Sequence, residues 1–303
     1  MSFSQDVKNE PYDTVDSARH CRIAELAALI RFCGKRDGDG ALIFETGHPE
    51  LLRLYVRLLR LVFHLEDGIE VRDTERKKTD FCMARVGDSA VAAKILQTID
   101  APTPVHSVIL QRNCCRRAFI RGAFLAAGSV SDPNRSYHFE IVCETAETAE
   151  DVCSILRLLE TDARMVKRQR YEVVYVKESA QISDLIGMMG ANVSLLNFEN
   201  VRIVREVRGG VNRKVNCETA NIEKTATAAA RQIDDIRYIE KTVGFSKLSK
   251  ALDEMAEIRL QYPTATLAEL GQLLNPPVSK SGVNHRLREL SRMADDLRNT
   301  RRQ

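Results

Sequence analysis

The residues best suited to recognise another molecule lie on a predicted helix near the C-terminal end of the chain, SKSGVNHRLRELSRMADDL (279–297). Its apolar residues have the spacing of one helical face: Val283, Leu287, Leu290 and Ala294. Asn and Arg side chains can pair with base edges in a DNA major groove, while Ser, Lys and backbone N–H groups can hold phosphates. The polar residues outside the apolar stripe are therefore candidate DNA contacts: Ser279, Lys280, Ser281, Asn284, His285, Arg286, Arg288 and Arg292.

The segment before this helix has the pattern of a helix-turn-helix. TATLAELGQLL (264–274) places Thr266 at an N-cap position and Glu269 three residues later, which is a capping box. Its predicted buried stripe is Leu267, Leu270 and Leu274. The following NPPV (275–278) cannot continue a helix. A short helix, a tight turn and a longer helix with a polar outer face are typical of DNA-binding domains. The alternative is an amphipathic hairpin with a solvated face.

Charge favours the DNA-binding alternative over the solvated hairpin. Residues 279–303 contain seven Lys or Arg and three acidic residues, a net charge of +4, while the whole chain has a net charge of +3. A basic end on a near-neutral body indicates a polyanionic partner. Trp is absent and aromatic residues are 6% of the chain, which argues against single-strand binding by base stacking.

Composition bounds the remaining possibilities. The 303 residues are 44% hydrophobic and 29% charged, which is typical of globular proteins, and no apolar run reaches the roughly 18 residues of a membrane span. The N-terminal MSFSQDVKNE lacks the apolar region of a secretory signal. Several cysteines, Cys114 and Cys115 among them, should lie in the core. The scattered cysteines form no CxxC pair, so we expect a reduced cytoplasmic protein with no disulfide framework, metal site or cofactor. They are Cys21, Cys33, Cys82, Cys114, Cys115, Cys143, Cys153 and Cys217.

The first two thirds of the chain contain an internal repeat. Each copy has the predicted order helix, strand, helix, strand, strand, helix. The predicted elements of the first copy are 26–34, 41–46, 48–63, 68–72, 80–86 and 88–99, and those of the second are 119–128, 137–144, 149–160, 163–168, 171–178 and 179–190. The glycines Gly34 and Gly128, 94 residues apart, end the first helix of each copy. Repeats of about 18–100 and 112–192 should pack into one pseudo-symmetric α+β domain spanning 1–204.

The first helices of the two repeats resemble a known motif. LAALIRFCG (26–34) and IRGAFLAAG (120–128) align without gaps to the LAGLIDADG motif of homing endonucleases. The resemblance implies that the two helices pack side by side, with small residues at the third position, here Ala28 and Gly122. The core residues expected between the repeats are Leu26, Ile30, Phe119 and Phe124.

The same resemblance implies an acid at the eighth motif position of each helix, where the pair holds the catalytic divalent metals. This chain has Cys33 and Ala127 there, and Arg31 and Leu125 at the sixth positions. Alanine cannot bind Mg²⁺ and a thiol is a poor ligand for it, so we expect no enzyme. Three acidic residues lie nearby, and each is a predicted turn residue: Asp37 and Asp39 in KRDGDGA (35–41) and Asp132 in SVSDP (129–133).

A third segment follows the repeats. Gly209 and Gly210 interrupt a polar, basic stretch, which predicts a linker over 205–218. An all-α domain should occupy 219–303, beginning with helices at 219–243 and 246–263. The first of these helices has apolar residues with a spacing of three or four, which predicts a buried face: Ile222, Ala226, Ala229, Ile233, Ile236 and Val243.

Taken together, the chain resembles the WhiA family of Gram-positive bacteria along essentially its whole length. Four segments carry the likeness: SFSQDVKNE (2–10), CCRRAFIRGAFLAAGSVSDP (114–133), VNRKVNCETANIEKT (211–225) and LAELGQLLNPPVSKSGVNHRLREL (267–290). The resemblance implies a transcription regulator of sporulation and cell division that acts at the nucleoid. It would bind double-stranded promoter DNA through the helix-turn-helix, and a partner regulator could assist it. The endonuclease-like domain would be catalytically inactive. The alternative is an RNA- or protein-binding adaptor without promoter recognition.

The predicted hairpin at 163–171 carries a basic cluster on the endonuclease-like domain: Arg164, Lys167, Arg168 and Arg170. These residues could contact duplex backbone as accessory DNA contacts. They could equally be a charged edge that discourages pairing with another strand. The sequence leaves both alternatives open, and it also allows this domain to bind a protein.

Overall fold

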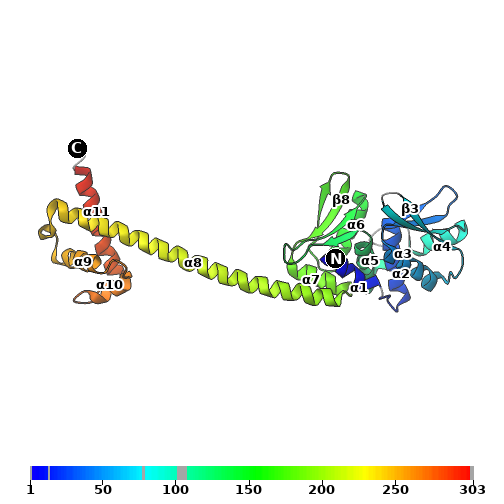
Figure 1. The fold of residues 1–303 in the computed structure, drawn as a ribbon, viewed down its shortest axis with the longest axis horizontal. Helices are drawn as coiled ribbons and strands as arrows, with labels where there is room; N and C mark the ends of the chain where they lie inside the picture. The colour runs from blue at the N-terminus through cyan, green and yellow to red at the C-terminus, as the bar shows by residue number, and fades with distance from the viewer. Residues whose placement is uncertain (1, 13, 77–78, 101–107, 301–303) are drawn as a thin grey trace. The chain divides into compact units, whose positions relative to one another are not determined.

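The computed structural model describes residues 2–12, 14–76, 79–100 and 108–300 (Figure 1). The chain divides into two compact units, Met1–Arg205 and Glu206–Gln303. In the described residues, no helix is long and apolar enough to cross a membrane.

The N-terminal unit contains the predicted repeat. After α1 (Phe3–Tyr12), the first copy comprises α2 (Arg19–Cys33), β1 (Gly34–Arg36), β2 (Leu42–Thr46), α3 (Pro49–Phe63), β3 (Ile69–Arg76), β4 (Thr79–Val86) and α4 (Ser89–Thr98). A short 3-10 turn, η1 (Val108–Leu110), precedes the second copy. That copy comprises α5 (Asn113–Ala127), β5 (Gly128–Val130), β6 (Phe139–Cys143), α6 (Ala146–Leu158), β7 (Arg164–Arg168), β8 (Tyr171–Val176) and α7 (Ser179–Met188).

The two copies build equivalent antiparallel sheets. The strand order is β1-β2-β4-β3 in the first sheet and β5-β6-β8-β7 in the second. The matching order confirms the pseudo-symmetric α+β architecture. The short strands β1 and β5, which the sequence pattern did not predict, begin at the motif glycines Gly34 and Gly128.

Helices α2 and α5 pack against each other between the two sheets (Figure 1). The four residues expected at this interface, Leu26, Ile30, Phe119 and Phe124, are all buried. A Cβ at Gly122 would lie 2.7 Å from the Glu25 carbonyl oxygen and 2.9 Å from Ala28 Cβ. Only glycine fits so close an approach, which confirms the role expected of the third motif position.

A buried ion pair crosses the same interface. Arg121 Nε and Nη2 lie 2.8 and 2.5 Å from the two carboxylate oxygens of Glu25, which is fully buried. Burial raises the pKa of Glu25, while the bidentate guanidinium of Arg121 favours the charged carboxylate. Removing one member of such a pair leaves an uncompensated charge in the core.

The N-terminal helix α1, which we did not predict, completes this unit together with the start of α8 (Asn192–Val243). The carboxylate of Glu10 accepts hydrogen bonds of 2.8 Å from the backbone N–H groups of Val193 and Ser194. A carboxylate at a helix N-terminus satisfies free N–H groups and complements the helix dipole. Phe3 stacks on Phe198 of α8 with ring centroids 6.2 Å apart.

The predicted linker at 205–218 is not an irregular segment. It lies within the uninterrupted helix α8, which continues through Gly209 and Gly210. Two glycines cost about 2 kcal/mol of helix propensity, but α8 is anchored in a hydrophobic core on either side of them, by Phe198 and by Ile236. Every residue from 210 to 228 is exposed, so the prediction of a buried face is wrong for Ile222 and Ala226.

The C-terminal unit is all-helical. The helix predicted at 219–243 is the end of α8, which stops before Gly244 in the left-handed region (φ 73°). Instead of one helix at 246–263, there is a 3-10 turn, η2 (Phe245–Lys247), followed by α9 (Lys250–Gln261). Then come α10 (Leu267–Leu273) and α11 (Lys280–Thr300). The core includes the predicted stripes of both helix-turn-helix elements: Leu270, Leu274, Val283, Leu287, Leu290 and Ala294.

We predict that Arg121→Met lowers the free energy of unfolding of the N-terminal unit by about 3–5 kcal/mol, because it leaves the Glu25 carboxylate buried and unpaired. The double variant Glu25→Met/Arg121→Met should recover most of that loss. Urea unfolding of the full chain, followed by hydrogen exchange of peptides from α2 and α5, measures both effects.

The exposed pair Arg53–Glu50, 2.8 Å apart, provides the control. Arg53→Met should change the stability by less than about 1 kcal/mol. Equal effects of the buried and exposed substitutions would show that the Glu25–Arg121 pair does not organise the interface.

Candidate nucleic-acid interface

The predicted recognition helix is α11, and its apolar stripe faces the core of the C-terminal unit. Val283 and Ala294 are fully buried, and Leu287 and Leu290 are 1% exposed. On the other side, six of the eight candidate DNA contacts are exposed: the N-cap residue Ser279, Lys280, Ser281, His285, Arg288 and Arg292. The helix thus presents a polar and basic face while its other face packs on α9 and α10.

The turn before α11 fixes this orientation. Thr266 and Glu269 form the predicted capping box at the start of α10. Gly271 allows the close packing of α10 on the turn, since a Cβ there would lie 2.2 Å from the Val278 carbonyl oxygen. The backbone N–H of Val278 donates to the Gly271 carbonyl over 2.9 Å. Ser279 Oγ accepts from the Gly282 N–H at 3.3 Å, so this hydroxyl caps α11.

Two of the candidate contacts are half-buried. Arg286 is half-buried, and its guanidinium donates to the Ala251 carbonyl of α9 over 3.4 Å. Asn284 is also half-buried. His285 Nδ1 lies 4.0 Å from a carboxylate oxygen of Glu289 one turn later. Arg288 and Arg292 are therefore the exposed arginines of the face.

The basic hairpin on the N-terminal unit consists of β7 and β8, and β7 is an edge strand. Three of its four candidate residues lie near carboxylates of the same unit: Arg164 at 3.1 Å from Asp162, Arg168 at 3.0 Å from Glu140 and Lys167 at 3.9 Å from Glu172. The Arg170 guanidinium instead lies 4.8 Å from the centre of the Tyr171 ring. These pairs reduce the positive potential of the hairpin and favour its interpretation as a protected edge.

The positions that would carry catalytic acids lie at the C-terminal ends of α2 and α5. Cys33 and Ala127 are both half-buried. Burial raises the pKa of the Cys33 thiol to about 11, so it is protonated near neutral pH. Neither side chain can supply the hard oxygen ligands that Mg²⁺ requires.

A lysine of α1 reaches the same region. Lys8 is 8% exposed, and its ammonium donates to the Leu125 carbonyl over 3.3 Å. It also lies 5.5 Å from the centre of the Phe124 ring. Burial lowers its pKa to about 8. At the sixth motif position of α2, Arg31 forms a 2.8 Å ion pair with Asp151 of the second repeat. Cations therefore occupy a region that would hold carboxylates and metals in a nuclease.

The nearby acids are turn residues, as predicted. Asp37 accepts from the backbone N–H groups of Asp39 and Ala41 at 3.1 and 2.8 Å, and Arg85 lies 3.2 Å from its other oxygen. Asp132 accepts from the Asn134 backbone N–H at 2.9 Å. Their carboxylates thus stabilise turns.

The structure also brings together residues that sequence analysis did not connect. His20, Cys21, Cys114 and Cys115 meet at the N-terminal ends of α2 and α5. Cys115 is buried as expected, whereas Cys114 is exposed, in contrast to the core position expected for it; Cys217 is also exposed. The sequence does contain a sign that these residues meet. The 94-residue offset between the motif glycines also separates His20 from Cys114 and Cys21 from Cys115, so the two pairs occupy equivalent positions in the two repeats.

Comparison with known proteins finds relatives of both units of this chain. The family model for the WhiA LAGLIDADG-like domain matches residues 116–208, and that for the WhiA C-terminal HTH domain matches residues 211–294. A crystal structure of full-length DUF199/WhiA from Thermatoga maritima has a TM-score of 0.59 at 24% identity, covering 98% of this chain and 99% of that one. This likeness supports the fold.

Curated relatives match along the whole chain. The probable cell division protein WhiA of Lachnoclostridium phytofermentans is 45% identical, covering 98% of this chain and 100% of that protein. The protein of the same name from Desulforamulus reducens is 41% identical, covering 98% and 97%. Identity at this level over the full length confirms the resemblance drawn from the sequence motifs, and the chain belongs to the WhiA family.

Proposed function

We propose that this protein is a sequence-specific, double-stranded-DNA-binding transcription regulator that acts in the cytoplasm at the nucleoid. The observation that carries the proposal is the exposed polar and basic face of α11. Its apolar stripe is buried against the rest of the C-terminal unit, so the N-terminal half of the helix is free to enter a major groove.

Each candidate side chain of α11 has a role in this proposal. Arg288 and Asn284 reach base edges, where a bidentate pair distinguishes one base from another. Lys280, Ser281 and the backbone at the start of α11 hold phosphates, helped by the helix dipole. His285 and Arg292 extend the face, and Ser279 and Arg286 support the orientation of the helix while lying at its edge. The β7–β8 hairpin is at most an accessory contact.

The genes under control are proposed from the relatives. Their printed name is that of a probable cell division protein, so we propose that promoters of cell-division genes, and of sporulation genes where the organism sporulates, are the targets. A partner regulator would act at the same promoters.

We further propose that the N-terminal unit does not cut DNA. Lys8 and Arg31 place positive charge at the end of the motif helices, where a nuclease holds metal ions between acids. In this proposal the packed motif helices hold the two repeats together and do not hydrolyse DNA.

We predict that Arg288→Ala and Asn284→Ala each weaken binding by about 1–3 kcal/mol, because each removes a contact to a base edge. The measurement is fluorescence anisotropy with the duplex that the wild-type protein enriches from a random-sequence pool, alongside a scrambled duplex. The loss should appear with the enriched duplex and be small with the scrambled one.

Arg237→Ala is the matched control, since it removes the same charge from an exposed position on α8. It should leave discrimination between the two duplexes unchanged. If Arg288→Ala and Asn284→Ala bind both duplexes like the wild type, α11 is not the recognition helix and the adaptor function gains support.

Lys8 gives a prediction for pH. Its pKa is about 8 in the folded protein, against 10.5 for an unperturbed lysine, so between these values the unfolded chain binds a proton that the folded chain has released. Stability should therefore rise with pH across this window relative to Lys8→Met, by about 3 kcal/mol in total. Below pH 8 the difference between the two proteins should be constant.

Urea unfolding at intervals from pH 7 to 10 measures the difference, and Lys94→Met, at an exposed position on α4, is the control. If the difference in unfolding free energy between the wild type and Lys8→Met is constant over the whole range, the Lys8 ammonium is not buried near the ends of the motif helices.

A further inference from the structure

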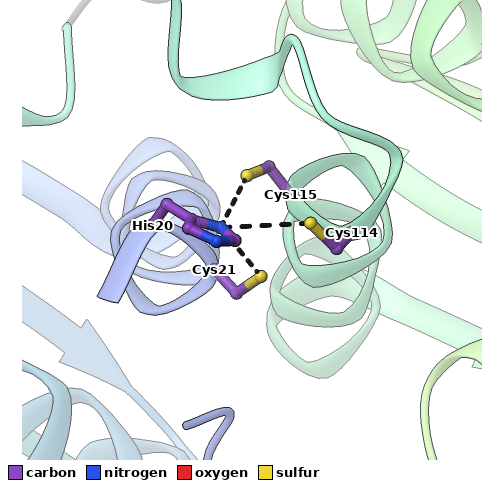
Figure 2. Close-up of side chains that lie close together, drawn as sticks. All are labelled: His20, Cys21, Cys114 and Cys115. Carbon is purple, nitrogen blue, oxygen red and sulfur yellow. Dashed lines mark hydrogen bonds between the residues drawn. The ribbon is translucent and has the colours of Figure 1, made fainter. Parts of the chain in front are cut away.

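The four residues that meet at the N-terminal ends of α2 and α5 form a set of metal-binding side chains. His20 and Cys21 lie in the first turn of α2, and Cys114 and Cys115 in the first turn of α5 (Figure 2). Side chains at neighbouring positions on a helix point about 100° apart, so the two members of each pair lie on either side of the direction toward the other helix. The pseudo-symmetry of the repeats makes the two pairs face each other.

The distances suit a single small ion. The sulfurs of Cys21, Cys115 and Cys114 lie 3.2, 3.3 and 3.9 Å from His20 Nδ1. All four potential ligand atoms lie within 4.8 Å of one another. A tetrahedral zinc ion, with Zn–S near 2.3 Å and Zn–N near 2.0 Å, requires about 3.5 Å between nitrogen and sulfur and about 3.8 Å between sulfurs. The side chains need only small adjustments to meet these values.

The geometry points to a structural zinc site with His20, Cys21, Cys114 and Cys115 as its four ligands. Three thiolates and one imidazole form a ligand set typical of Zn²⁺, whereas Mg²⁺ and Ca²⁺ require oxygen. Four protein ligands complete a tetrahedral shell and leave no position for a reacting water. The ion would therefore join the two motif helices at the end opposite Cys33 and Ala127, and it would not catalyse cleavage.

The surroundings are compatible with thiolates and with metal entry. Both helix N-termini direct their positive dipole ends toward the cluster, and Arg112 adds positive charge near Cys115, partly opposed by Asp16 near Cys21. Cys21 and Cys115 are buried, while the exposed Cys114 offers a route from solvent.

The test uses the full chain without an affinity tag, reduced, supplied with zinc and then freed of loose metal by gel filtration. We expect one zinc ion per chain by elemental analysis and native mass spectrometry. Cys114→Ser and Cys115→Ser should lower the zinc content at least about tenfold. Cys217→Ser, which removes an exposed cysteine from the other unit, should retain the wild-type content.

Two further measurements separate metal binding from loss of fold. Because Cys114 is exposed, Cys114→Ser should keep the circular dichroism of the wild type while losing the metal. Cobalt(II) added to the reduced, zinc-free protein should give the ligand-field and thiolate charge-transfer absorption of a tetrahedral sulfur-rich site. Zinc should also slow hydrogen exchange in the first turns of α2 and α5.

Several results would overturn the proposal. They are a zinc-free wild type after zinc is supplied, a Cys114→Ser variant with the wild-type zinc content, or a cobalt spectrum without thiolate charge transfer. A disulfide among Cys21, Cys114 and Cys115 in a chain that takes up no zinc when reduced would assign the cluster to thiol oxidation instead.

Discussion

The close packing of α2 against α5 is the constraint on which the rest of the N-terminal unit depends. Gly122 lets the two backbones approach, and the buried Glu25–Arg121 pair fixes how they align. Each helix then leads directly, through Gly34 or Gly128, into the first strand of its own sheet, so the packing also sets the relation of the two sheets. A substitution at the helix interface would be transmitted to both repeats.

This arrangement explains why the motif helices persist while their acids do not. The apolar and small residues of the motif face the partner helix and the core, where replacements leave cavities or clashes. The eighth positions lie at the half-buried helix ends, so Cys33 and Ala127 are tolerated without disturbing the packing. Lys8 and Arg31 add positive charge at the same end, where a divalent cation would be repelled.

The repeat, the order of most elements along each copy and the helix-turn-helix could be predicted because their signals are local: apolar periodicity, turn residues and the capping box of Thr266 and Glu269. The helical course of 205–218 could not, since Gly209 and Gly210 signal a break and the helix is anchored in the cores of both units. Helix α1 was missed because its packing partner, Phe198, is almost two hundred residues away. The meeting of His20 and Cys21 with Cys114 and Cys115 likewise requires the paired repeats, although their 94-residue offset was already visible. Six of the eight candidate DNA contacts on α11 are exposed, whereas Asn284 and Arg286 are half-buried, and the sequence could not foresee the bond of Arg286 to the Ala251 carbonyl.

The most direct test of a DNA-binding regulator on a non-cutting scaffold is one titration of pooled promoter duplexes with the full chain in Mg²⁺ buffer at two salt concentrations. Mobility shift and strand integrity are both measured on the same samples. We predict a shift that weakens steeply with salt, selective enrichment of some duplexes and intact strands throughout. Cleaved strands, or no shift at either salt concentration, would contradict the proposed function.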